Sequence, residues 1–104
     1  MLVEFVGNKA QMASNKHFGG KLNEEQMKKL VAMVISNPSY VGYSDRANAG
    51  HSVAKIVWGE VAGIMLSVTL DGDDIKRGKA TVVSMYDVHD VKWKAKRFNM
   101  KKVG

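Results

Sequence analysis

Apolar residues recur at helical spacing in the first third of the chain and alternate with polar residues after it. One helix face is predicted by residues spaced i, i+3, i+4, i+7 and i+8: Met27, Leu30, Val31, Val34 and Ile35. Asn23 precedes this helix and Gln26 follows three residues later, which is the spacing of a capping box. Pro38 ends the helix, because the residue before a proline is pushed out of the helical region. A shorter helix is predicted over residues 9–18, with Asn8 as its cap and Gly19-Gly20 as its stop.

The rest of the chain is strand-rich. Strands are predicted over residues 40–44, 52–58, 61–70 and 79–86. The Gly59-Glu60 turn joins the second and third of them, residues 45–50 form a polar loop, and residues 71–78 form a turn. The segment 90–98 fits either a helix or an irregular strand. We therefore expect one α+β domain over residues 1–104, with N-terminal helices packed on one face of a twisted antiparallel β-sheet of about four strands.

Alternation along the strands assigns side chains to the two faces of this sheet. The row expected to face the helices is apolar: Ala54, Ile56, Trp58, Ala62, Ile64, Leu66, Val68, Leu70, Thr81, Val83 and Met85. The opposite row then carries Lys55, Val57, Ser67, Val82, Ser84 and Tyr86. Lys55, Ser84 and Tyr86 are thus predicted to meet on one open face.

Charge separates the end of the chain from the rest. Residues 79–104 carry seven Lys/Arg against Asp87 and Asp90, a net of +5, whereas residues 1–78 carry nine Lys/Arg and eight Asp/Glu, a net of +1. Such a basic segment is typical of a protein that binds a phosphate backbone, and a solvated basic tail is the alternative.

Composition excludes several classes of function. The chain has no cysteine, so it has no disulfide, thiolate nucleophile or cysteine-ligated zinc. His17, His51 and His89 lack the spacing of a zinc site, and Asp71-Gly72-Asp73-Asp74 fits a turn better than a calcium loop. We therefore expect no metal and no cofactor. With no apolar run of spanning length and no signal-like start, the domain is expected to be soluble and, if exported, to travel as part of something larger.

RNA hydrolysis without a metal needs a proton carrier and groups that stabilise a charged phosphorane. His17, in the last turn of the first predicted helix, is the candidate proton carrier. Lys55 supplies a fixed charge, Ser84 a neutral donor, and Tyr86 a donor or a surface for a stacked base. Each residue also has a purely structural interpretation: a capping histidine, a solvated edge lysine, a tyrosine over the core.

Five parts of the chain resemble the phage-type branch of the barnase/EndoU/colicin/RelE ribonuclease superfamily. They are Lys16-His17, Met33 to Gly42 with its Asn37-Pro38-Ser39-Tyr40-Val41-Gly42 turn, Lys55 in a strand, Met65 to Gly72, and Val82-Val83-Ser84-Met85-Tyr86 before a lysine-rich end. The similarity covers roughly residues 16–104. It departs at Phe18-Gly19-Gly20, where the group more often continues a helix or has a proline, and at Ser84, where threonine is commoner.

This resemblance implies a metal-independent endoribonuclease toxin domain with catalytic residues His17, Lys55, Ser84 and Tyr86. It implies tRNA as the substrate, cleavage by transesterification to a 2′,3′-cyclic phosphate, and delivery within a larger secreted or phage-borne polypeptide to the cytoplasm of a competing bacterium. The expected partners are RNA and an acidic immunity protein, with the domain itself monomeric. The residues predicted to bind RNA are Lys16, Ser67, Lys94, Lys96, Arg97, Lys101 and Lys102.

Three other functions stay open at the level of sequence. A ribosome-dependent mRNA interferase would cut only in the presence of ribosomes. A non-catalytic RNA- or DNA-binding module would use the same basic face without cutting. A phage structural domain would carry its charge incidentally.

Overall fold

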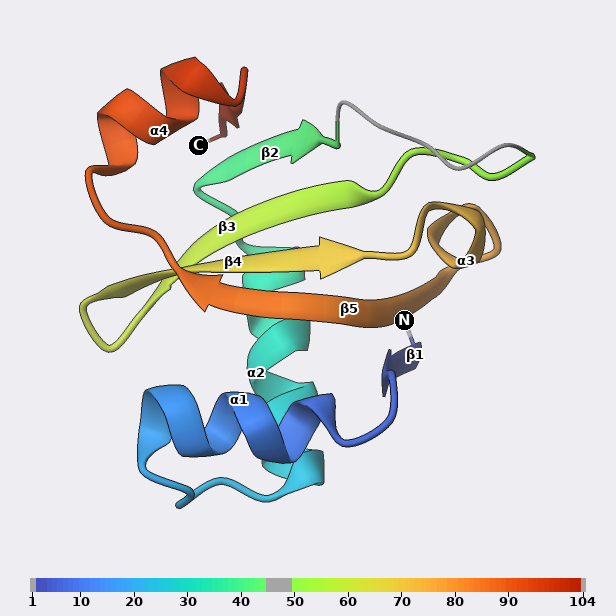
Figure 1. The fold of residues 1–104 in the computed structure, drawn as a ribbon, viewed down its shortest axis with the longest axis vertical. Coiled ribbons are helices and arrows are strands. Elements are labelled where there is room, and N and C mark those ends of the chain that lie inside the picture. The colour runs from blue at the N-terminus through green and yellow to red at the C-terminus, as the bar shows by residue number, and fades with distance from the viewer. Residues whose placement is uncertain (1, 45–49, 104) are drawn as a thin grey trace.

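The computed structural model describes residues 2–44 and 50–103, which form four helices and one six-stranded mixed sheet (Figure 1). The elements in chain order are β1 (Leu2–Phe5), α1 (Lys9–Phe18), α2 (Glu24–Ser36), β2 (Tyr40–Tyr43), β3 (Lys55–Val61), β4 (Ile64–Leu70), α3 (Gly72–Lys76), β5 (Lys79–Asp87), α4 (Val91–Arg97) and β6 (Lys101–Lys102). Strand order is β1-β5-β4-β3-β2-β6, with β1 parallel to β5. The α+β class is confirmed. The four expected strands are present as β2 to β5 and pair antiparallel. The short β1 and β6 extend the sheet to six strands, and β1, parallel to β5, makes it mixed.

The two N-terminal helices begin and end where the sequence places their signals. The Asn23 side chain accepts from the Gln26 N–H at 2.8 Å, and the Gln26 side chain accepts from the Asn23 N–H at 2.9 Å. This capping box fixes the start of α2. Gly19 ends α1 in the left-handed region at φ 62°, as predicted, whereas the Asn8 side chain makes no capping hydrogen bond.

The hairpin between β3 and β4 turns later than predicted. Val61 pairs with Ile64, so Ala62 and Gly63 form a two-residue turn with φ of 51° and 80°. Gly59 instead lies inside β3 and is buried. A Cβ at this position would come within 2.8 Å of Val34 Cγ1, so the glycine allows α2 to approach the sheet closely.

The main core lies between α2 and one face of the sheet. The helix contributes Leu30, Val31 and Val34, and the strands contribute Val57, Leu66, Val68, Leu70 and Val82. The predicted β4 row is confirmed for Ile64, Leu66, Val68 and Leu70, but Ala62 is exposed in the turn. The faces of β3 were assigned wrongly, since Val57 and not Trp58 faces α2. The register jump between Thr69 and Leu70 places Val82 opposite Leu70 in the core, where Val83 was expected.

A second, smaller core explains the inverted β3 assignment. Trp58 is buried against Ala95 of α4 together with Val88 and Met100. Figure 1 shows α2 behind the sheet and α4 at its upper left. Because α2 packs on the face that carries Val57 and α4 on the face that carries Trp58, the sheet has a helix on each face. The segment 90–98 is therefore mainly helical. Because both faces are partly covered, the bulkier row of β3 does not point toward α2.

Candidate nucleic-acid interface

The structure separates the four predicted catalytic residues. Ser84 pairs with Thr69 and Tyr86 with Ser67, which places both on the sheet face that also carries Trp58. Lys55 pairs with Leu70 and therefore lies on the opposite, α2-covered face of β3. The expectation that Lys55 shares a face with Ser84 and Tyr86 is wrong. Its cause is the inverted assignment of β3.

His17 is buried and not on the surface. Its side chain is 0% exposed, and Nδ1 lies 2.6 Å from Oδ1 of Asp87 at the end of β5. These atoms are within ion-pair distance but are not aligned as a hydrogen-bond donor and acceptor, and Nε2 has no partner within the described parts of the chain. The predicted surface position of His17 is therefore wrong. In this arrangement its ring cannot reach an RNA hydroxyl.

A cleft of about 320 Å³ lies between α4 and the sheet face that carries Tyr86. Its lining is largely aromatic: Tyr43, Trp58, Tyr86 and Phe98, with Ile56, Met100, Ser44, Arg97 and Asn99 completing the walls. We call it the α4 cleft. Its size lies at the lower end of the range of small-ligand pockets.

Three of the four rings are open to solvent. Tyr43 is 60% exposed, Phe98 49% and Tyr86 36%. A further hollow of about 290 Å³ shares Tyr43, Phe98 and Asn99 with the α4 cleft and also contacts Lys101. Tyr43 and Phe98 thus lie between the two hollows, and a ligand in either hollow can contact their rings.

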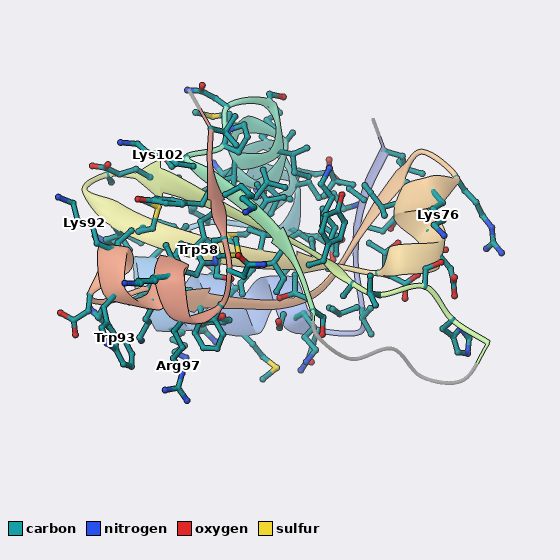
Figure 2. The ribbon with its side chains drawn as sticks, turned by 90° about the horizontal axis from the view of Figure 1, so that it is seen from above. Trp58, Lys76, Lys92, Trp93, Arg97 and Lys102 are labelled. Carbon is teal, nitrogen blue, oxygen red and sulfur yellow. The ribbon has the colours of Figure 1, made fainter. Side chains whose placement is uncertain are left out.

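Two cations of the C-terminal segment lie beside these rings, Arg97 in the α4 cleft and Lys101 in the neighbouring hollow. The Arg97 guanidinium lies 5.4 Å from the Trp93 ring centroid and 5.9 Å from that of Phe98. Figure 2 shows Trp93 and Arg97 projecting from α4 on the side away from α2, with Lys92 and Lys102 at the same end of the molecule and Lys76 at the other. The strand pairing of β6 with β2 fixes Lys101 opposite Val41 and Lys102 opposite Tyr40.

Two polar side-chain atoms beneath α4 have no hydrogen-bond partner within the described residues: Trp58 Nε1 and Ser67 Oγ. Ser67 pairs with Tyr86 on one side and with Trp58 on the other, and it is fully buried. The prediction that Ser67 contacts RNA is therefore wrong for this arrangement. Trp58 lines the α4 cleft, but its indole nitrogen is buried, so the ring and not the N–H contributes to the wall.

The remaining predicted RNA contacts divide between two places. Lys94, Lys96, Arg97, Lys101 and Lys102 all belong to α4 or β6. Lys16 is on α1, where it lines a different cleft together with Ser84. Tyr43, Trp58 and Phe98 were not among the site residues predicted from the sequence. The alternation of cations and rings in Lys92-Trp93-Lys94-Ala95-Lys96-Arg97-Phe98 was a usable signal for the last of these.

An accessible histidine–carboxylate pair lies at the start of α3. His51 Nδ1 is 2.7 Å from Asp73 Oδ2, and the Ser52 N–H donates to Asp73 Oδ1 at 2.9 Å. The His51 contact, supported by the Ser52 N–H, lowers the pKa of Asp73 from 3.8 to about 2. His51 is 63% exposed and is thus more accessible than His17.

Within residues 2–44 and 50–103, no group of three or more acidic or histidine side chains is arranged to hold a metal ion. None of the helices described is both long and apolar enough to cross a bilayer.

Comparisons with known proteins found no family model, curated protein or solved structure that matches the chain. The resemblance to the ribonuclease superfamily therefore stays a prediction that rests on residues 16–104 of this sequence.

Proposed function

We propose that the protein binds single-stranded RNA at the α4 cleft. The observation that carries this proposal is the set of partly exposed rings, Tyr43, Tyr86 and Phe98, that line one hollow with Arg97. Aromatic side chains stack on bases, each such contact contributing about 1–3 kcal/mol, and every base offers a π-face. The hollow therefore suits an unpaired base of any identity.

The surrounding charge suits the backbone of the same ligand. The net of +5 over residues 79–104 comes largely from α4 and β6. None of Lys94, Arg97 and Lys101 has a carboxylate within ion-pair distance in the described residues, so these charges are free to meet phosphates. Single strands are favoured over duplexes because paired bases hide their faces from aromatic rings.

Cleavage of RNA is a separate prediction. Burial of His17 against Asp87 does not support its role as a proton carrier. The ribonuclease activity, the tRNA substrate, delivery within a larger polypeptide and the acidic immunity partner stay predictions. The exposed His51 beside Asp73 is the histidine to test if RNA is cut.

Fluorescence anisotropy with an end-labelled single-stranded RNA tests binding. We expect Arg97→Gln to weaken binding and to reduce the slope of log K against log salt concentration by about 0.7, the value for one lost phosphate contact on a single strand. Lys29→Gln, which removes one charge from the exposed face of α2, is the matched control and should change binding little. Equal effects of both variants would show attraction by net charge alone and would overturn the proposed site.

Incubation of the same RNA with the protein and EDTA separates binding from cutting. Intact RNA that is shifted on a gel fits a binding module. Fragments that persist in His17→Ala and disappear in His51→Ala would move catalysis to the α3 end. Loss of cutting in His17→Ala alone would require that His17 becomes accessible in the complex.

A further inference from the structure

A second and larger cleft lies between α1 and β5. It measures about 550 Å³ and its lining is mainly apolar with two lysines: Phe5, Lys9, Met12, Ala13, Asn15, Lys16, Val82, Ser84 and Met85. We call it the α1 cleft. A mostly apolar hollow of this size with a few convergent polar groups is typical of a ligand site.

The topology of the sheet explains why this cleft exists. β1 pairs with β5 only from Leu2 to Phe5, and the last bond on this side is donated by the Val6 N–H to the Val82 carbonyl at 3.2 Å. Beyond Val82, no strand of the described residues pairs with β5 on the side away from β4. α1 lies against this edge instead of a strand, and the space between helix and edge is the cleft.

The wall formed by α1 presents cations at both ends of an apolar surface. Lys9, Met12, Ala13 and Lys16 stand at i, i+3, i+4 and i+7, so they lie on one face of the helix. The two lysine Cα atoms are about 10 Å apart along the axis. Neither lysine has a carboxylate within ion-pair distance among the residues that the structure describes. Two unpaired cations over an apolar surface suit an anionic ligand that also carries flat apolar groups.

The α1 cleft and the α4 cleft meet on β5. Ser84 lines the first and Tyr86 lines the second, and the two residues are about 7 Å apart on the same face of the strand. Figure 1 shows α1 below β5 and α4 above it, with the exposed face of the sheet between them. A chain molecule held in the α4 cleft can therefore cross β5 over Tyr86 and Ser84.

We propose that one RNA strand occupies both clefts, with a second nucleotide in the α1 cleft. Its base lies on the apolar surface of Met12, Ala13 and Met85, and the phosphates on either side of it meet Lys9 and Lys16. Ser84 donates its hydroxyl hydrogen to the backbone at the crossing. This inference rests on the proposed function at the α4 cleft, and it adds a second subsite and a minimum length of strand.

Binding of uridine oligomers of increasing length tests the second subsite. We expect affinity to rise from dinucleotide to hexanucleotide in the parent protein. Lys9→Gln combined with Lys16→Gln should remove most of that rise, leave dinucleotide affinity unchanged, and reduce the hexanucleotide salt slope by about 0.7 for each lysine. The control is Lys21→Gln combined with Lys29→Gln, which removes the same charge from exposed positions outside both clefts. Equal slopes in the two double variants would overturn the second subsite.

Methyl NMR of the methionines distinguishes failure of this inference from failure of the proposed function. Met12 and Met85 line the α1 cleft, Met100 lines the α4 cleft, and Met33 is exposed on α2. The dinucleotide should shift Met100 alone, and the hexanucleotide should shift Met100, Met12 and Met85, with Met33 unchanged. A hexanucleotide that shifts only Met100 overturns the second subsite and leaves the α4 cleft intact. No shift of Met100 with either oligomer overturns both.

Discussion

Tyr43, Tyr86 and Phe98 present ring surface to solvent, while Trp58 beside them is buried. A contiguous exposed apolar surface costs hydrophobic free energy and commonly marks a contact site. Here the rings gather around one hollow instead of lying scattered, and Arg97 lies over the ring of Phe98. At the scale of single residues, these rings determine whether the protein contacts the bases of RNA or only its phosphates.

Replacing Tyr43 with alanine tests recognition of bases. Tyr43→Ala should weaken RNA binding by about 1–3 kcal/mol, because one stacking surface is lost. Its cost in stability should stay within about 0.5 kcal/mol because the side chain is largely exposed. Anisotropy and thermal melting measure the two effects. Met33→Ala, at a similarly exposed apolar position on α2, is the control. Similar RNA affinities for the two variants would contradict stacking at this ring.

His17 has the opposite character, since it is a titratable side chain inside the fold. His17→Ala removes the only described partner of a buried Asp87 oxygen, which should lower the free energy of unfolding by about 1–3 kcal/mol. Urea denaturation measures this loss, and RNA affinity should stay unchanged at temperatures where the variant is folded. A stable variant with impaired RNA cleavage would instead support the catalytic role predicted from the sequence.

At the scale of elements, α4 has the largest effect on the site. It buries Trp58 through Ala95, carries Arg97 to the cleft, and leads through Phe98 to β6. The hairpin of β3 and β4 sets the register that places Trp58, Ser67 and Tyr86 in one row across three strands. That register depends on a tight turn at Ala62 and Gly63.

Substitutions at the two turn residues should change the stability of the protein in opposite directions. Ala62 has φ 51°, a conformation that costs a residue with a Cβ about 1–2 kcal/mol. Ala62→Asn should raise stability by about 0.5–1 kcal/mol, because asparagine followed by glycine suits this turn. Gly63→Ala should lower stability, because φ 80° disfavours a residue with a Cβ, although the added Cβ would meet no atom within 4 Å. Thermal melting of both variants measures the changes, and the same sign for both would mean that the turn differs from the one described.

Local signals predicted the helices better than the sheet faces. The Asn23–Gln26 capping box and the Gly19 stop act within one turn, so sequence alone locates them. β1 was not predicted, because a four-residue strand is too short to show an alternating pattern and depends on its pairing with β5. The faces of β3 were predicted wrongly because both of its side-chain rows are apolar, one packed on α2 and the other on α4. Alternation alone cannot tell which apolar row faces which helix. Lys55 was wrongly grouped with Ser84 and Tyr86 for this reason, whereas His17 was misplaced because its burial against Asp87 is a long-range contact.

At the scale of the whole molecule, basic and acidic side chains lie at opposite ends of the sheet. The basic α4 and β6 lie at one end of the sheet, and the acidic Asp71, Asp73 and Asp74 lie at the start of α3 on the other. RNA should therefore approach the α4 end, since cations predominate there, whereas the three aspartates at α3 are offset by Lys76, Arg77 and Lys79. The α3 end instead contributes to stability through its contacts with the loop before β3.

That contribution has a defined pH dependence. The pKa of Asp73 is lowered to about 2 by His51 and the Ser52 N–H, so its stabilising effect is complete above the unfolded value of 3.8 and is lost as pH falls toward 2. Asp73→Asn should be less stable than the parent near neutral pH, and the difference in melting temperature should shrink between about pH 4 and pH 2. Glu60→Gln, which removes an exposed carboxylate outside this contact, is the control. A difference that stays constant over this range would contradict the ionic contact.

Photocrosslinking tests the central claim most directly, because it locates bound RNA on the unmodified protein. A single-stranded oligomer that contains 4-thiouridine is irradiated with the protein, and mass spectrometry identifies the residues joined to it. Binding at the α4 cleft predicts crosslinks at Tyr43, Tyr86 or Phe98, which disappear when unlabelled single-stranded RNA competes. Crosslinks confined to α2 or α3, or none above those of a duplex of the same sequence, would contradict it.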